Sequence, residues 1–254
     1  REHNPRADIV LTYFVNPGMK ELLQQGEIPL AIQAHAAVAR HYKINTIHLA
    51  REVTEQISQG KLTWKKFGGT HPAPFGNRIC ADMIAQLFER CWKNLPADAK
   101  SEPHELPEIS VDPLNYQFAR FVPLSEAEIA SGWKIKTPDW TGLPGSKRDR
   151  FTQIPMLVAD KPGAEFSFSF AGTTAIAYVS AGPDAGQLEV AVNDGPFETV
   201  ELFHRYSKGL HYPRSVVLAT ALPRGKHRLR VRLSQEHHSD SVGTAARIMD
   251  LGAN

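Results

Sequence analysis

One histidine of this 254-residue chain stands on a loop rich in proline and glycine, where an imidazole can move protons. The loop reads Gly68-Gly69-Thr70-His71-Pro72-Ala73-Pro74-Phe75-Gly76-Asn77, and an amphipathic segment follows it. Imidazole titrates near neutral pH, so a positioned histidine can take a proton from a hydroxyl nucleophile and pass it to a leaving group. His71 is therefore a candidate general base, and the alternative is a loop histidine that only caps or packs. We expect Phe75 and Asn77 to shape the start of the following helix, with Asn77 as its N-cap.

Five cationic side chains alternate with other residues near the C-terminal end of the sequence. They are Arg224, Lys226, Arg228, Arg230 and Arg232. Successive side chains of a strand point to opposite faces, so a strand here would present all five on one face. Guanidinium groups bind carboxylates and sulfates in a bidentate manner, and Arg228 and Arg230 are therefore candidate substrate-binding residues for an anionic polysaccharide. The alternative is a solvated sheet face whose cations are balanced by acidic neighbours.

The eleven histidines raise the question of a metal site. The best candidate ligand sets are His237-His238 with Asp240, and His204 with His211. Neither set has the close spacing of a zinc site, so we expect hydrogen-bonded or surface histidines and no bound metal.

Composition narrows the classes of partner. The hydrophobic fraction of 42% and the charged fraction of 22% are typical of globular proteins. The net charge of +2 gives no reason to expect nucleic acid or a membrane as the main partner, and no apolar run approaches the ~18 residues of a membrane span. Cys80 and Cys91 fall in one expected helix, about 16 Å apart along its axis, which is too far for a disulfide.

Alternating strands and helices are expected to position the histidine loop. The apolar run over residues 8–15 is typical of a strand buried on both faces of a parallel sheet. The remaining elements of this part are a helix over 28–42, a strand over 44–49, and helices over 50–59 and 77–94. Two strands do not complete a parallel sheet, so further strands are expected upstream of residue 1.

Two of these helices have apolar faces that we expect to be buried. In the helix over 28–42 the face consists of Leu30, Ala34, Val38 and Tyr42. In the helix over 77–94 it is a continuous stripe of Ile79, Met83, Ile84, Leu87, Phe88, Cys91 and Trp92.

The second half has the pattern of an all-β domain. Residues 96–117 are rich in proline and acidic residues and lack periodicity, which indicates a linker or strap between a first domain over 1–95 and a second over 118–254. Strands are expected over 164–171, 174–180, 187–192, 197–203, 215–219, 227–233 and 245–251, with Asn193-Asp194-Gly195 as a hairpin turn. This spacing predicts a β-sandwich of jelly-roll type. The aromatic rings that can either stack on sugars or pack in the core are Trp133, Trp140, Tyr178, Tyr206 and Tyr212.

Three segments of the first part resemble the C-terminal half of the catalytic domain of an SGNH (GDSL-like) hydrolase. They are Asn4-Pro5-Arg6-Ala7-Asp8-Ile9-Val10, the positions Ala36, Val38, Ala39, Arg40, His41 and Tyr42, and His71-Pro72-Ala73-Pro74-Phe75-Gly76. The second part, with its segments 155–160 and 181–186, looks like the accessory β-sandwich of some bacterial members. The resemblance implies a partial three-layer, flavodoxin-like α/β domain with a parallel sheet, followed by an all-β sandwich. It also implies a serine esterase that acts on O-acyl esters of carbohydrates without a cofactor, in a secreted or periplasmic location.

The site that this resemblance implies has a serine in a Gly-Asp-Ser motif, oxyanion donors from a glycine and an asparagine, and a C-terminal Asp-x-x-His. Only the last element maps onto this chain: His71 matches the base, and Gly68 stands at the position of the Asp. Without that carboxylate, a backbone carbonyl or another acid would have to orient the imidazole, or activity would be weak. The serine and the oxyanion donors are expected upstream of residue 1, in a longer precursor or in a second polypeptide. The alternative function is a non-catalytic carbohydrate-binding or structural module.

Overall fold

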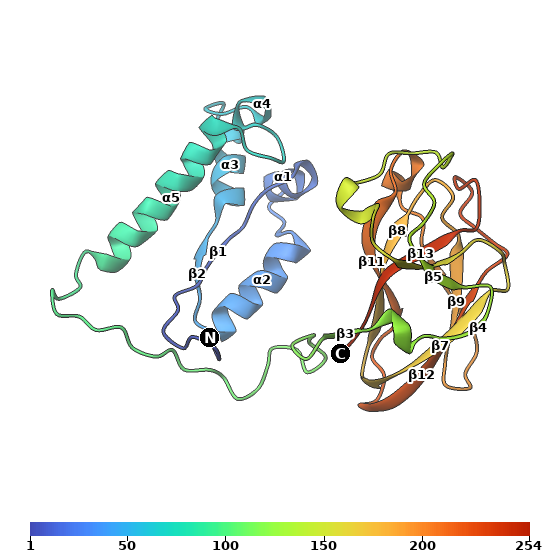
Figure 1. Cartoon of the computed structure of the whole chain (residues 1–254). Helices are drawn as coiled ribbons and strands as arrows, with labels where there is room; N and C mark the ends of the chain where they lie inside the picture. The colour runs from blue at the N-terminus through green and yellow to red at the C-terminus, as the bar shows by residue number, and fades with distance from the viewer. The chain divides into compact units, whose positions relative to one another are not determined.

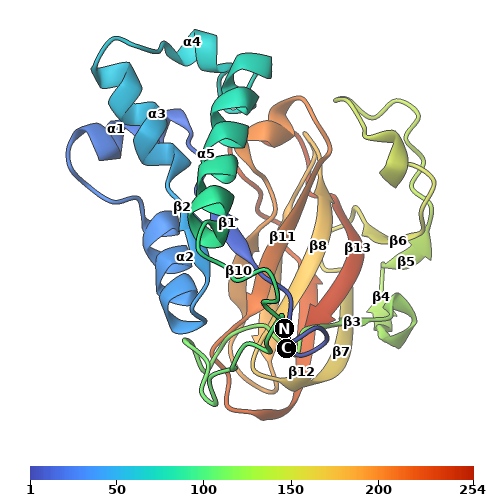
Figure 2. The same cartoon turned by 90° about the vertical axis from the view of Figure 1, so that its left-hand side faces the viewer.

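The computed structural model describes all residues from Arg1 to Asn254, as Figure 1 and Figure 2 show from two sides. The chain folds as two compact units, unit 1 over Arg1–Asn115 and unit 2 over Tyr116–Asn254, and each has its own core. Unit 1 is of the α/β class and unit 2 is a sandwich of antiparallel sheets, so the expected fold class is confirmed. No helix is both long enough and apolar enough to cross a membrane.

Unit 1 is built on two parallel strands, β1 (Val10–Thr12) and β2 (Asn45–Ile47). Its helices are α1 (Pro17–Gln24), α2 (Leu30–His41), α3 (Leu49–Ser58), α4 (Trp64–Phe67) and α5 (Pro74–Trp92). Both α2 and α5 contact β2, and Figure 1 shows them on either side of the strand pair. The helices α1 and α4 were not predicted from the sequence. The start of α1 is nevertheless encoded locally, because the Asn16 side chain caps it and Pro17 occupies its first position.

The core of unit 1 forms where the helices cover the end of β1. Its largest fully buried side chains are Leu49 and Phe67. The face of α2 that points inward is not the expected one, because Ile32 is buried whereas Leu30 and Val38 are 80% and 37% exposed. Apolar residues surround most of this helix, so their spacing alone does not select the buried face.

The apolar stripe of α5 is covered over only part of its length. The first turns pack against the core and Leu87 is buried, but Ile84, Phe88 and Trp92 are 37%, 39% and 59% exposed. The rings of Phe88 and Trp92 stack on each other with their centroids 4.7 Å apart. The C-terminal half of α5 therefore presents an apolar surface that nothing in unit 1 covers.

Residues 93–115 form neither helix nor strand and are held against unit 1 by hydrogen bonds. The main-chain N–H of His104 donates to the Pro5 carbonyl at 2.8 Å, and its Nε2 donates to the Asp8 carboxylate at 3.0 Å. Nε2 of His41 donates to the Ile109 carbonyl at 2.7 Å. The segment 96–117, expected as a strap between domains, thus lies in unit 1 as far as residue 115.

Unit 2 is a sandwich of two antiparallel sheets. One has the strand order β10-β9-β12-β7-β4 and the other β11-β8-β13-β6-β5, with β3 paired to β13. The strands are β3 (Arg120–Val122), β4 (Glu128–Ser131), β5 (Lys134–Lys136), β6 (Met156–Ala159), β7 (Glu165–Gly172), β8 (Ala175–Ala181), β9 (Gln187–Val192), β10 (Glu198–Glu201), β11 (Tyr212–Ala219), β12 (Gly225–Leu233) and β13 (Ala246–Ala253). Short 3-10 helices cover Leu124–Glu126, Asp149–Phe151 and Arg205–Lys208.

The seven expected strands correspond to β7 through β13, and the turn over residues 193–195 joins β9 to β10 as expected. The strands β3 to β6 were not predicted from the sequence. Every residue of β4 and β5 is exposed, so neither strand shows the alternation of buried and exposed positions on which the prediction depends.

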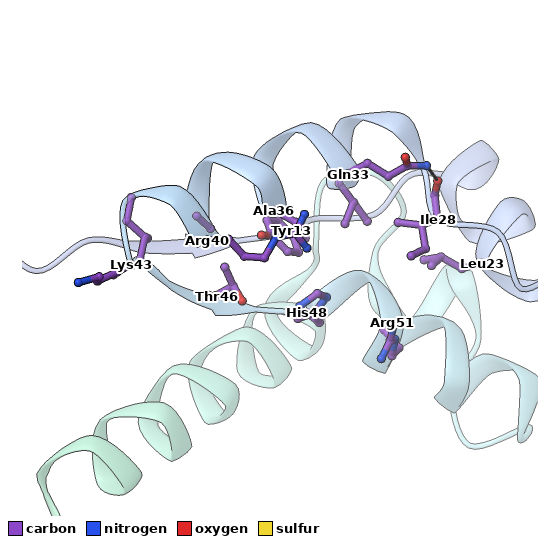
Figure 3. Close-up of a pocket in the computed structure, with 13 residues that line it drawn as sticks. Tyr13, Leu23, Ile28, Gln33, Ala36, Arg40, Lys43, Thr46, His48 and Arg51 are labelled. Carbon is purple, nitrogen blue, oxygen red and sulfur yellow. Dashed lines mark hydrogen bonds between the residues drawn. The ribbon is translucent and has the colours of Figure 1, made fainter. Parts of the chain in front are cut away.

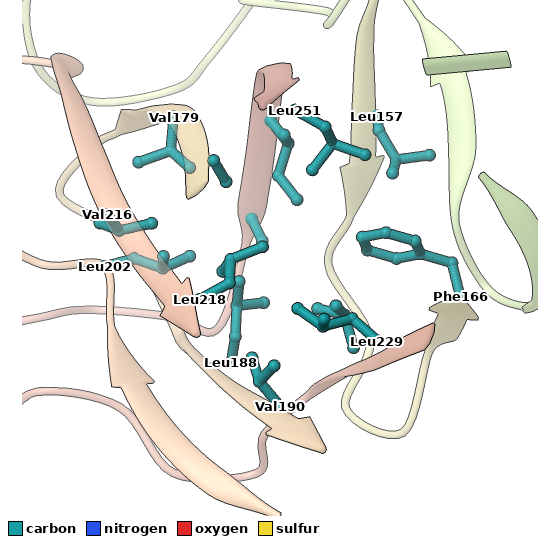
Figure 4. Close-up of a cluster of buried hydrophobic side chains, with 14 of the residues drawn as sticks. Leu157, Phe166, Val179, Leu188, Val190, Leu202, Val216, Leu218, Leu229 and Leu251 are labelled. Atoms are coloured by element: carbon teal, nitrogen blue, oxygen red, sulfur yellow. The ribbon is translucent and has the colours of Figure 1, made fainter. Parts of the chain in front are cut away.

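The inner faces of the two sheets enclose one apolar core (Figure 4). On β7, the alternating Phe166, Phe168 and Phe170 are at most 4% exposed, and on β12 Leu229 and Val231 are fully buried. A fully buried side chain of this size stabilises a fold by about 1.5–3 kcal/mol. Unit 2 therefore buries its own apolar faces.

Candidate functional site

His71 lies on the turn that joins α4 to α5. The Thr63 side chain caps the N-terminus of α4, and Gly68 ends the helix in the left-handed conformation. The main-chain N–H of Ala73 then donates to the Phe67 carbonyl at 2.9 Å. This hydrogen bond closes the base of the loop and so limits where His71 can lie.

The loop has no room for a side chain three residues before His71. Gly68 has a φ of +109°, and a Cβ at this position would lie 2.0 Å from the main-chain nitrogen of Ala73. An Asp at position 68 could not adopt this backbone without moving the loop. A close approach also occurs at Gly76, where a Cβ would lie 2.1 Å from the Phe67 carbonyl oxygen. The absence of the carboxylate expected from the resemblance thus has a steric reason.

The imidazole of His71 is exposed, and no group of the chain forms a hydrogen bond or ion pair with it. The following helix α5 begins at Pro74, with Ala73 as a cap residue whose side chain makes no capping bond. The prediction that Asn77 caps this helix is therefore wrong, because the helix starts three residues earlier than expected. Instead, Nδ2 of Asn77 donates to the Pro72 carbonyl at 3.3 Å. His71 is chemically open: it can accept a proton from a hydroxyl that another segment presents.

A hollow of about 700 Å³ lies between α2, β2 and the start of α3 (Figure 3). Tyr13 and His48 follow the carboxyl ends of β1 and β2 directly, and their rings meet edge to face at 4.8 Å. The Tyr13 hydroxyl is buried without a hydrogen-bond partner. Burial, and then the charge of Arg51, lower the pKa of His48. Arg40 also lines this hollow, and no carboxylate does. The lining of the hollow therefore suits a small anion or a hydrogen-bond acceptor. His71 does not line it, so the hollow is not a site for acyl transfer through His71.

The cations of β12 lie on the outer face of their sheet, and three of them contact carboxylates. The ion pairs are Arg228–Glu128 at 2.6 Å, Arg230–Glu165 at 3.1 Å and Arg232–Glu189 at 2.7 Å. Nη2 of Arg228 also donates to Ser167 Oγ at 2.8 Å. The ring of Phe197 contacts both Arg230 and Arg232, with its centroid 5.0 and 4.3 Å from their guanidinium carbons. The face is thus cationic in sequence but largely balanced in charge.

The aromatic candidates of unit 2 divide into buried and exposed rings. Trp133 is 3% exposed and packs edge-on against Phe166 in the core. Tyr206 is 49% exposed and lies beside His204 and Tyr212, whose rings stack at 4.8 Å. His204 and His211, which we considered together as metal ligands, therefore have different surroundings.

His211 belongs to a buried polar cluster that sequence analysis did not find. Arg247, 5% exposed, donates two hydrogen bonds of 2.9 and 2.6 Å to Asp184. Nε2 of His211 donates to the Pro144 carbonyl at 3.0 Å, and its ring packs edge-on against Trp140. Its members are far apart in sequence, 63 residues in the case of the ion pair, so no local pattern reveals it.

Within this cluster the pKa values of His211 and Asp184 are both shifted. Burial, and then the positive charge of Arg247, lower the pKa of His211. Burial raises the pKa of Asp184, but the hydrogen bonds and charge of Arg247 outweigh it, and the net shift is downward. The cluster therefore holds a neutral imidazole beside an ionised pair.

No protein-family model and no curated protein sequence matches this chain. Among solved structures it is similar to a two-domain esterase (CEX) active on acetylated mannans, with a TM-score of 0.69 and 16% identity over 96% of this chain. A structure of that esterase with mannopentaose gives a TM-score of 0.69 and 15% identity over 96% of this chain. This chain spans 62% and 61% of the length of those two chains. At this identity the likeness shows the fold, and both units of the chain take part in it.

Proposed function

We propose that this chain is the histidine-bearing part of a serine esterase of the SGNH type, which removes O-acyl groups from carbohydrates. The observation that carries this proposal is the position of His71, exposed and without a partner, on a closed loop that directly precedes α5. The fold shared with a two-domain carbohydrate esterase supports it. The serine and the oxyanion donors come from a segment upstream of residue 1 or from a second polypeptide.

In this proposal His71 acts first as a base and then as an acid. It takes the proton of the serine hydroxyl while the serine oxygen attacks the ester carbonyl carbon. The tetrahedral intermediate then collapses, the bond to the sugar oxygen breaks, and His71 returns the proton to that oxygen. Water repeats the sequence on the acyl-enzyme, which releases the carboxylic acid and restores the serine. Since position 68 is glycine, the group that orients the imidazole in this proposal is a backbone carbonyl or an acid from the segment that carries the serine.

Two features of unit 1 support a partner segment. Strand β1 pairs with β2 on one side and has no strand on the other. The exposed half of the α5 stripe, with Phe88 and Trp92, is an apolar surface of the kind that an α/β domain normally covers. A segment that adds a parallel strand to β1 and packs on α5 would bury both.

The second candidate function is a non-catalytic carbohydrate-binding or structural module. The observation that favours it is the lack of any carboxylate on His71, together with the steric exclusion of one at position 68. In this alternative Arg228 and Arg230 would bind an anionic polysaccharide, which would have to compete with Glu128 and Glu165 for the guanidinium groups.

A fluorophosphonate probe that labels activated serines separates the two candidates. The material is purified natively, and the intact mass of every polypeptide present is measured after labelling. The esterase proposal expects the label on a longer form of the chain, upstream of residue 1, or on a co-purifying polypeptide. A label within residues 1–254, or none while a reference serine esterase is labelled in parallel, contradicts it.

A further inference from the structure

Two hollows adjoin at the end of the sandwich where β3 begins, and Arg120 and Asn254 line both of them. The larger, about 490 Å³, has an apolar floor that includes Ile176 and Val217. The smaller, about 280 Å³, is lined by Arg120 together with Arg224 and the ring of Phe118. We call the two hollows together the rim groove. Its surface changes from apolar to cationic along its length.

Neither arginine of the rim groove forms an ion pair with an Asp or Glu side chain. Nη1 of Arg120 donates to the Ala171 carbonyl at 3.2 Å, and the guanidinium carbon of Arg224 lies 6.0 Å from the centroid of the Phe118 ring. No Asp or Glu side chain lines either hollow. This differs from Arg228 and its neighbours on β12, each of which contacts a glutamate. The Arg224 guanidinium therefore faces a hollow that no acidic side chain lines, where an external anion can approach it.

Exposed aromatic rings gather at the same place. Tyr116, Phe118 and Phe121 lie within six residues of one another and are 57%, 62% and 78% exposed. A group of exposed rings of this kind is typical of a surface that binds a ligand or partner. A ring offers a flat apolar face, and a pyranose offers a matching face of C–H groups.

We infer that the rim groove binds an acidic oligosaccharide, with a uronate carboxylate on Arg224 and Arg120 and sugar rings on Phe118 and the apolar floor. A neutral glycan offers the two guanidinium groups only uncharged hydroxyl acceptors, and a purely apolar partner would desolvate them without any acceptor. A planar carboxylate matches the guanidinium fork. This inference does not depend on the proposed esterase function, because binding at the rim groove needs neither His71 nor a serine.

The test measures binding of the full chain by isothermal titration calorimetry. The ligand is tetragalacturonate, and mannopentaose serves as a neutral oligosaccharide. We expect tetragalacturonate to bind and mannopentaose to bind at least about tenfold more weakly, since a charge-assisted hydrogen bond is lost. Raising the salt concentration to about 0.5 M should weaken the binding of tetragalacturonate but not that of mannopentaose, because salt screens the charges.

Variants locate the site. Arg224→Gln and Phe118→Ala should each weaken tetragalacturonate binding about tenfold, and Arg224→Lys, which keeps the charge but loses the fork, should fall between wild type and Arg224→Gln. Arg148→Gln is the matched control, since Arg148 is an exposed arginine without an ion pair outside the groove. Its affinity should stay within about twofold of wild type. Thermal melting of each variant checks that the sandwich remains folded.

Several outcomes would overturn the inference. They are the absence of uronate binding, equal binding of mannopentaose, and an equal loss in Arg148→Gln. Equal, Arg224-dependent binding of a sulfated oligosaccharide would make the groove a general anion surface instead. Self-association of the chain that Phe121→Ser abolishes, without uronate binding, would assign the groove to a protein partner.

Discussion

The sheets of the two units differ in how they are completed and covered. Unit 2 closes two sheets over a core in which Phe166, Phe168 and Leu229 are fully buried. Unit 1 has a two-stranded parallel sheet and leaves Phe88 and Trp92 of α5 exposed. The strand pair of unit 1 has helices on either side, but β1 has a free edge and the C-terminal half of α5 is uncovered, whereas the two sheets of unit 2 cover each other's inner faces. His71, which we propose as the catalytic base, lies in the unit that has the free strand edge and the uncovered helix face.

Replacing His71 should have the largest effect, because it removes the base that we propose for both half-reactions. In the serine-bearing assembly, His71→Ala should lower kcat for hydrolysis of an acetylated oligosaccharide by about three orders of magnitude or more, with little change in the fold. The matched control is His35→Ala, since His35 is an exposed histidine on α2. Near wild-type turnover of the His71 variant would remove His71 from the mechanism, whatever the assembly contains.

Breaking the buried ion pair should be the largest perturbation of unit 2. Asp184→Asn leaves the Arg247 guanidinium buried without its charge partner, so the free energy of unfolding of the sandwich should fall by about 3–5 kcal/mol. Asp240→Asn provides the comparison, because the Lys208–Asp240 pair is exposed and should be worth under about 1 kcal/mol. Urea denaturation followed by tryptophan fluorescence measures both. Equal losses in the free energy of unfolding would mean that the buried Asp184–Arg247 pair stabilises unit 2 no more than the exposed Lys208–Asp240 pair does.

A substitution in the exposed stripe of α5 should change the free energy of unfolding less than a substitution in the core of unit 2. Trp92→Ser should change the free energy of unfolding by about 0.5 kcal/mol or less, whereas Leu229→Ala should cost about 2–5 kcal/mol. Trp92→Ser should also reduce binding of a hydrophobic fluorescent dye to the folded chain. If Trp92→Ser destabilised the chain as much as Leu229→Ala, the stripe would be buried and the contrast between the units would fail.

The smallest effect is expected on the cationic face of β12. Replacing Arg228 and Arg230 with Ala together should weaken retention on a uronate column about twofold, because each guanidinium already has a carboxylate partner. Unchanged retention would leave this face as a solvated, charge-balanced surface. A loss greater than that of Arg224→Gln would place the anion site on β12 instead of at the rim groove.

The sequence predicted those elements that carry their own periodicity. The alternation of Phe166, Phe168 and Phe170 predicted β7 because one face of that strand is buried in the core. The strands β4 and β5 have no such signal, since both are exposed, and only pairing with β7 and β6 makes them strands. The buried face of α2 was assigned wrongly because the choice between faces depends on tertiary packing.

The candidate sites divide in the same way. His71 could be singled out from the sequence because its loop of glycines and prolines directly precedes an amphipathic helix. Its role as a base remains a proposal. Arg120 and Phe118 gave no signal, because they meet Arg224 only through the pairing of β3 with β13. The carboxylates that balance Arg228 and Arg230 come from β4 and β7, which neighbouring positions in the sequence do not reveal.

The buried cluster of Asp184, Arg247 and His211 makes the stability of the sandwich depend on pH. Because the pKa of His211 is lowered in the folded state, its neutral ring contributes stability that is present above its unfolded pKa of about 6.5 and is lost as the pH falls through the folded pKa. Asp184, also lowered, adds a second loss that begins only below about pH 3.9. Melting temperatures from pH 8 to pH 3 should therefore fall in two stages, and His211→Gln should reduce the first, to which His48 and His204, with pKa values also lowered, contribute as well. Mild acidification would therefore loosen this one corner of the sandwich before the rest of its core responds.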